Sequence, residues 1–109
     1  MTTHQHVTLL DGGMGRQLER IGAPFRLPEW SALALIETPD LVQKAHEQFI
    51  ESGAEIVTTN TYAIKPHQIG AERFETDGLR LAGLAGQVAR AAADQAGRPV
   101  KVAGSLPPV

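Results

Sequence analysis

The chain has 109 residues, 42% hydrophobic and 20% charged, a formal net charge of -2 at pH 7 and no cysteine. This length allows one domain, and the ordinary apolar and charged fractions exclude wholesale disorder and fibrous repeats. The slightly acidic balance gives no electrostatic footprint for nucleic acid or an anionic membrane surface, and the lack of cysteine excludes disulfides, thiolate metal ligands and thiol nucleophiles.

The amino-terminal segment, Met1 to His6, precedes the first apolar run. It has neither a basic stretch nor an apolar stretch of its own, so we expect a disordered leader rather than a secretory signal, and a cytoplasmic protein. We interpret His4 and His6 as part of this frayed terminus rather than as metal ligands. No apolar run approaches the roughly 18 residues typical of a membrane span, so we expect no membrane partner.

The first structured unit is predicted to be a strand followed by a short helix. Val7 to Leu10 is an apolar run that ends at a glycine-rich turn, Asp11 to Gly15, which is typical of a buried strand and its following loop. Apolar residues then recur at helical spacing between Met14 and Ile21, and Gly22 follows as a stop. A short helix after the first strand is the consequence.

Two further helical segments are predicted before the second strand. The run from Trp30 to Ile36 is consistent with a helical turn packed on the body. A longer helix then starts at Thr38, which we expect to cap it, because Pro39 suits the first helical position and Asp40 faces the positive end of the helix dipole. Gly53 ends this helix.

The second half of the chain continues the alternation. Ala54 to Thr59 supplies the β-branched residues of a second strand, and 60–70 is predicted as a loop. A helix is predicted from Thr76 to Ala96, and a third strand from Val100 to Gly104. Strands that alternate with helices form a parallel sheet, and three strands leave one sheet edge open.

Polar residues follow each predicted strand, where parallel α/β folds form their sites. Asp11 comes after the first strand, Asn60 and Thr61 after the second, and Ser105 after the third. A carboxylate at a strand end needs a partner such as a substrate ammonium or backbone amides.

Several motif interpretations fail or stay open. The glycine-rich turn lacks the third glycine of a dinucleotide fingerprint, where Leu18 stands, and it lacks a P-loop lysine. Glycines that serve only a tight strand-to-helix turn remain an alternative. His46 begins a zincin-like pattern, but Ile50 replaces the second histidine, so we expect His46 to be a packed or surface residue and His67 to be a lone loop residue.

Trp30 is the only tryptophan. Core packing is its default interpretation. An aromatic ring near strand ends also suits stacking on a cationic ligand, and the sequence leaves both open.

Five blocks, running in order from about Val7 to the last residue, resemble the amino-terminal part of the homocysteine S-methyltransferase family. No single block is decisive, but their order is difficult to obtain by chance. They are Leu9 to Gly15, Trp30 to Ala32, Pro39 to Val42 with His46, Gly53 to Tyr62, and Val102 to Leu106 with Pro107.

The resemblance implies an α/β fold, the first three βα units of a (β/α)8 TIM barrel. Such a barrel usually needs about 250 residues, so residues 1–109 are expected to be a partial homocysteine-binding domain, truncated after the third strand. In the family, zinc binds the homocysteine sulfur and is held by three cysteines from later strands. The chain has no cysteine, so we expect neither metal ligands nor catalytic residues within it.

The resemblance also implies substrate-binding roles for six residues. In the family, the glycine-rich turn lines the homocysteine pocket and helps to fix its amino acid end, the end of the second strand lines the same cavity, and in some members the tryptophan lies toward the methyl donor. These residues are Asp11, Gly12, Gly13, Asn60, Thr61 and Trp30.

The activity that the resemblance implies is methyl transfer from a donor such as S-methylmethionine or S-adenosylmethionine to L-homocysteine, which gives methionine. Betaine and methyltetrahydrofolate serve other relatives. Without the zinc ligands, we expect the 109-residue chain to be inactive alone. The alternative is a non-catalytic fragment that associates with itself or another chain through its open sheet edge.

Overall fold

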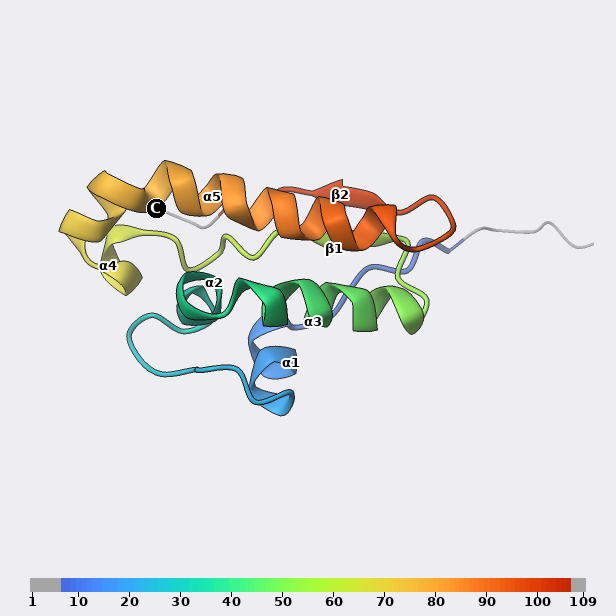
Figure 1. Ribbon diagram of the computed structural model, residues 1–109, viewed down its shortest axis with the longest axis horizontal. Helices are drawn as coiled ribbons and strands as arrows, with labels where there is room; N and C mark the ends of the chain where they lie inside the picture. The colour runs from blue at the N-terminus through green and yellow to red at the C-terminus, as the bar shows by residue number, and fades with distance from the viewer. Residues whose placement is uncertain (1–6, 107–109) are drawn as a thin grey trace, which may run out of the picture.

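The computed structural model describes residues 7–106 (Figure 1). The predicted leader, residues 1–6, lies outside the described residues, as do residues 107–109. The described elements are, in chain order, α1 (Met14–Arg20), α2 (Ala32–Glu37), α3 (Pro39–Glu51), β1 (Ile56–Thr58), α4 (Pro66–Ile69), α5 (Ala71–Asp94) and β2 (Lys101–Ala103).

The predicted parallel sheet is confirmed. β1 and β2 pair in parallel, with Val57 opposite Val102, and α5 forms the crossover between them. The buried first strand predicted for Val7 to Leu10 is wrong: only Leu10 makes a parallel bridge, to Ile56, and its side chain is 58% exposed. Val7, Leu9 and Leu10 are all exposed, so little burial of apolar side chains holds this segment in a regular strand.

The core has two clusters of buried side chains, one among the helices and one between the long helices and the sheet. α3 and α5 run side by side in Figure 1, and Val42 and Ala45 of α3 are fully buried with Leu81 and Ala85 of α5. Burial of a leucine side chain contributes about 1.5 to 3 kcal/mol. Val57 of β1 is also fully buried, so this face of the sheet is covered by helices.

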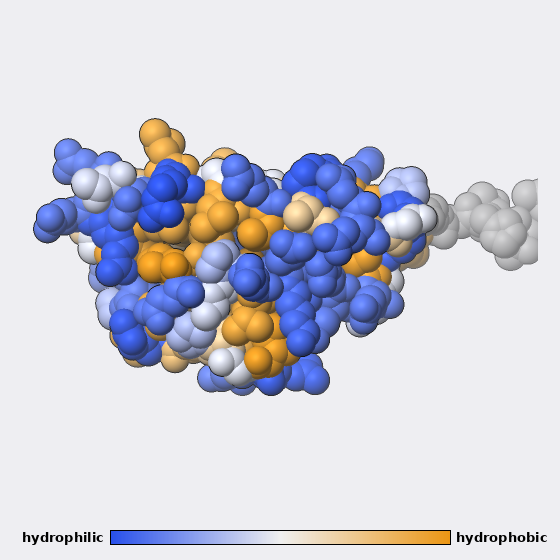
Figure 2. Space-filling view, in the orientation of Figure 1, coloured by the Kyte–Doolittle hydropathy of each residue, from blue (hydrophilic) through white to orange (hydrophobic). Residues whose placement is uncertain are grey.

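The surface of this core is mostly hydrophilic. On the face shown in Figure 2, polar and charged residues predominate and apolar side chains gather in separate patches. None of the helices described in residues 7–106 is long and apolar enough to cross a membrane.

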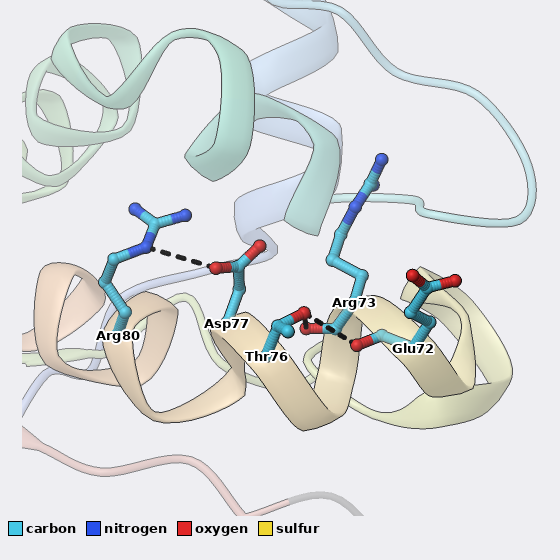
Figure 3. Close-up of polar contacts among 5 residues, drawn as sticks. All are labelled: Glu72, Arg73, Thr76, Asp77 and Arg80. Atoms are coloured by element: carbon cyan, nitrogen blue, oxygen red, sulfur yellow. Dashed lines mark hydrogen bonds and ion pairs between the residues drawn. The ribbon is translucent and has the colours of Figure 1, made fainter.

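Three predictions about helix starts and loops differ from the structure. Thr38 stands at the N-cap position of α3, as predicted, but its side chain does not cap the helix, because its Oγ1 donates back to the carbonyl of Ala34 at 3.2 Å. Thr76 does not start α5, which begins at Ala71, because its Oγ1 donates to the carbonyl of Glu72 at 2.7 Å inside the helix (Figure 3). The predicted loop 60–70 contains the four-residue helix α4. Hydroxyl side chains satisfy a preceding carbonyl as readily as a free amide, so they mark helix starts ambiguously.

Candidate functional site

A cavity of about 620 Å³ opens where both strands end. That volume is in the usual range for small-molecule sites. Its walls come from the turn before α1, from α1 itself, from the segment between α1 and α2, and from the residues after β1 and β2. The lining residues are Gly12, Met14, Gly15, Arg16, Glu19, Phe25, Trp30, Ser31, Thr58, Thr59, Asn60, Tyr62 and Ser105.

Asp11 lies beside this cavity and is held by β1. Its carboxylate accepts hydrogen bonds from the backbone N–H of Thr58 at 2.9 Å and from the Thr58 hydroxyl at 3.1 and 3.2 Å. Its own N–H donates to the carbonyl of Ile56 at 3.1 Å. The hydrogen-bond partner expected for the Asp11 carboxylate is therefore Thr58, through its backbone amide and its hydroxyl. Thr58 itself lines the cavity.

Asn60 and Thr61 fix two other walls. The Asn60 side chain is 4% exposed and donates to the carbonyl of Ser31 at 3.0 Å, which ties the segment before α2 to the end of β1. The Thr61 hydroxyl donates to the carbonyl of Ser105 at 2.5 Å, and the N–H of Ser105 donates to the Thr59 hydroxyl at 3.1 Å. These bonds hold the ends of β1 and β2 together.

Close packing explains two glycines of the turn. A Cβ at Gly12 would lie 3.1 Å from Cε1 of Phe49, and a Cβ at Gly15 would lie 3.1 Å from Cε2 of Phe25. Both contacts are tighter than ordinary van der Waals separation. Gly13 precedes α1 with φ of -70°, a conformation open to any residue. Gly12 and Gly15 therefore have a structural role, because an aromatic ring packs closely against each of them.

Trp30 lies in the cavity wall, so its default interpretation as a core residue is wrong. Its side chain is 46% exposed, and its backbone has φ of +52°. A bulky residue in this left-handed region costs about 1 to 3 kcal/mol, and such strain concentrates at binding sites. The N–H of Trp30 donates to the carbonyl of Arg26 at 2.8 Å, which holds the turn in place.

Four residues of the cavity, two aromatic and two charged, have no substrate-binding role in the sequence prediction. Phe25 and Tyr62 are half-exposed, and the Lys65 ammonium lies 5.1 Å from the centroid of the Tyr62 ring. Arg16 and Glu19, one turn apart on α1, place Nη1 and Oε1 3.9 Å apart. Tyr62 directly follows the polar residues after β1, so its position carried a signal, whereas the other three lie on α1 and the segment after it.

His46 is confirmed as a packed residue. Its side chain is fully buried on α3, and neither ring nitrogen has a hydrogen-bond partner in the described structure. Burial lowers the pKa of His46 from 6.5 to about 4, and the charge of Asp11 opposes this shift. His46 is therefore neutral at physiological pH.

The residues that the structure describes do not fit a metal site. Within residues 7–106 no three histidine, aspartate or glutamate side chains gather as ligands, and the whole sequence has no cysteine. His67 is exposed on α4 and takes no part in the cavity.

The chain is similar to known methyltransferases. The family model described as homocysteine S-methyltransferase matches residues 8–109. Homocysteine S-methyltransferase 1 of Arabidopsis thaliana is 44% identical over 54 residues, which are 50% of this chain and 17% of the relative. Selenocysteine methyltransferase of Astragalus bisulcatus is 33% identical over 87 residues, 79% of this chain and 26% of the relative.

A solved structure gives the same result. The crystal structure of the homocysteine methyltransferase MmuM from Escherichia coli, in its metallated form, superposes with a TM-score of 0.79 and 32% identity. The superposition covers 95% of this chain and 38% of MmuM. The chain thus spans well under half the length of the relatives it matches.

Proposed function

Since this chain belongs to the homocysteine S-methyltransferase family, we propose that it supplies part of an enzyme that transfers a methyl group to L-homocysteine and yields methionine. The observation that carries the proposal is the cavity at the strand ends, where the turn after Leu10 meets the residues after β1 and β2. The comparisons support this enzymatic interpretation over a non-catalytic binding module.

The proposed architecture is the first three βα units of a (β/α)8 barrel, with residues 1–109 as a partial domain. Two features support it. The irregular segment at Leu10, β1 and β2 lie side by side in parallel, with Ile56 between Leu10 and Lys101. The polar residues gather at the carboxyl ends of these segments, where barrels of this kind place their sites.

Six residues are proposed to bind substrate, three directly and three through their neighbours. Gly12, Asn60 and Trp30 line the cavity. Asp11 and Thr61 reach it through hydrogen bonds to residues that line it, and Gly13 joins the turn to α1. The six are Asp11, Gly12, Gly13, Asn60, Thr61 and Trp30.

Methyl transfer between two small molecules depends on holding them in line and excluding water. In the proposed enzyme, the residues of this chain position the two substrates. The bonds of Asn60 to Ser31 and of Thr61 to Ser105 fix the cavity walls, and Asp11 anchors the turn to Thr58. No residue of the chain is proposed to act as an acid or a base.

The methyl donor is proposed to lie against Trp30. A sulfonium donor such as S-methylmethionine or S-adenosylmethionine carries a permanent positive charge, which an aromatic face attracts by about 0.5 to 2 kcal/mol. Phe25 and Tyr62 line the same cavity. Zinc is proposed to belong to the whole enzyme, held by residues outside this chain, because the described residues offer no ligand cluster and the sequence has no cysteine.

A chimera tests the proposal. Residues 8–106 replace the matched segment of E. coli MmuM, and methionine formed from L-homocysteine and S-methylmethionine is measured by NMR. We expect the chimera to form methionine. Asn60→Leu should reduce the rate at least about tenfold because the wall bond to Ser31 is lost. Gln87→Leu, at an exposed position on α5, is the control and should not change the rate.

A chimera that unfolds cooperatively but forms no methionine with either sulfonium donor would overturn the proposal. If the Asn60→Leu and Gln87→Leu chimeras had equal activity, the cavity would have no role in the reaction.

A further inference from the structure

An ion pair stands on one wall of the cavity. Among the lining residues, Arg16 and Glu19 are the charged ones, and both belong to α1. Their side chains are 82% and 56% exposed, and the Nη1 to Oε1 distance of 3.9 Å is at the outer limit of an ion pair. Such an exposed pair contributes about 0 to 1 kcal/mol to stability. A ligand can therefore separate these two charges at little cost.

The rest of the nearby wall is apolar or aromatic. Met14 lies on the first turn of α1, and Phe25 and Trp30 follow in the segment after the helix. The Phe25 ring packs over Gly15 of α1, the helix that also carries Arg16 and Glu19. The wall thus combines a positive charge, a negative charge and aromatic faces.

This combination matches one class of ligand. An α-amino acid carries a carboxylate and an ammonium on one carbon, with a side chain beyond them. An arginine guanidinium binds a carboxylate through paired N–H donors, and a glutamate carboxylate accepts from an ammonium. A cationic or apolar side chain of the ligand then suits the aromatic faces.

Resting on the proposed function, we infer that Arg16 and Glu19 bind the amino acid end of the methyl donor. Arg16 receives the α-carboxylate and Glu19 receives the α-ammonium, while the sulfonium lies toward Trp30. The donor class is then an α-amino acid that carries a sulfonium. Betaine lacks a free α-ammonium and a folate presents different groups, so both fit this wall less well.

The chain offers a matched control pair away from the cavity. Asp77 and Arg80 are also one turn apart, on α5, and their Oδ1 and Nε lie 3.5 Å apart (Figure 3). Their side chains are 39% and 63% exposed, and neither lines the cavity. Loss of a surface ion pair as such can therefore be separated from loss of this one.

The experiment measures binding to the full 109-residue chain by isothermal titration calorimetry. The probes are S-methyl-L-methionine, 3-(dimethylsulfonio)propylamine, which lacks the carboxylate, and 4-(dimethylsulfonio)butyrate, which lacks the amine. The proteins are the unchanged chain, Arg16→Gln, Glu19→Gln, and the controls Arg80→Gln and Asp77→Asn. Circular dichroism verifies that each variant keeps the helical content of the unchanged chain.

We expect the unchanged chain to bind S-methyl-L-methionine at least about tenfold more tightly than either analogue. Arg16→Gln should bind S-methyl-L-methionine no more tightly than 3-(dimethylsulfonio)propylamine. Glu19→Gln should bind it no more tightly than 4-(dimethylsulfonio)butyrate. Arg80→Gln and Asp77→Asn should keep both preferences. Equal binding of all three probes, no binding of any, or preferences unchanged in Arg16→Gln and Glu19→Gln would each overturn the inference.

The two proposals fail separately. A chimera with MmuM that forms methionine, with the same KM for S-methylmethionine after Arg16→Gln, overturns this inference and leaves the proposed function intact. An inactive chimera, together with probe preferences that depend on Arg16 and Glu19 in the 109-residue chain, overturns the function and leaves the binding site.

Discussion

Acid is expected to destabilise the chain through His46. This side chain is fully buried on α3, and its two ring nitrogens have no partner in the described structure. Protonation would place a charge in this apolar interior, and the carboxylate of Asp11 offsets that cost only in part. The folded chain therefore keeps His46 neutral at pH values where the unfolded chain has already protonated it.

The size of the effect follows from the two pKa values. The pKa of His46 is about 4 in the folded chain, against 6.5 for an unperturbed histidine. Because the unfolded state binds the proton more tightly, stability is lost as the pH falls below 6.5, and the loss levels off below about 4. Between pH 7 and pH 5 the free energy of unfolding should fall by about 2 kcal/mol, and by about 3 kcal/mol at pH 4.

Urea denaturation followed by circular dichroism at pH 7, 6 and 5 measures this loss. His46→Leu removes the titrating group and leaves an apolar side chain, so its loss from pH 7 to 5 should be smaller than that of the unchanged chain by about 2 kcal/mol. His67→Leu, at an exposed position on α4, controls for the loss of a histidine. If His46→Leu loses as much stability in acid as the unchanged chain, burial of this histidine does not govern the acid response and the reasoning is refuted.

Substitutions at four further positions are expected to change the free energy of unfolding, measured in urea at pH 7. Thr58→Val removes the hydroxyl that donates to Asp11 and should cost about 1 kcal/mol, whereas Thr58→Ser keeps the hydroxyl and should cost much less; no loss in Thr58→Val would show that the hydroxyl does not stabilise the chain. Gly83→Ala on α5, whose Cβ meets nothing within 4 Å, should add about 1 kcal/mol. Gly53→Ala, at φ of +113°, should cost at least about 1 kcal/mol. A Gly53→Ala chain more stable than the Gly83→Ala chain would contradict this. Arg98→Met removes hydrogen bonds of 2.6 and 3.0 Å to two carbonyls around the end of α3 and should cost about 1 kcal/mol; an unchanged midpoint would show that water replaces them.

The helices were predictable where the signals are local. α3 is flanked by Pro39 and Gly53, and both act on the adjacent backbone, so its bounds agree with prediction within two residues. The side-chain cap expected of Thr38 and the helix start expected at Thr76 are wrong because a hydroxyl binds either a free amide or a preceding carbonyl, and the sequence does not say which. The first strand failed because burial of Leu10 depends on neighbours that the local sequence does not specify.

The site was predictable in outline and not in its walls. Polar residues after strands indicated Asn60 correctly as part of the cavity, because strand ends meet at one edge of a parallel sheet. Arg16 and Phe25 were missed because α1 and the segment after it reach the strand ends only through tertiary packing. The backbone strain at Trp30 likewise has no signature in residue type.

The hydrogen bonds that build the cavity have a kinetic consequence. Asp11 bonds to a residue 47 positions away, Asn60 to one 29 positions away, and Thr61 to one 44 positions away. Forming each of these hydrogen bonds closes a long loop, which costs conformational entropy before the bond contributes. The helices, in contrast, form from neighbours in sequence. The cavity is therefore among the last parts of the chain to assemble, and a ligand that binds there would slow unfolding more than it speeds folding.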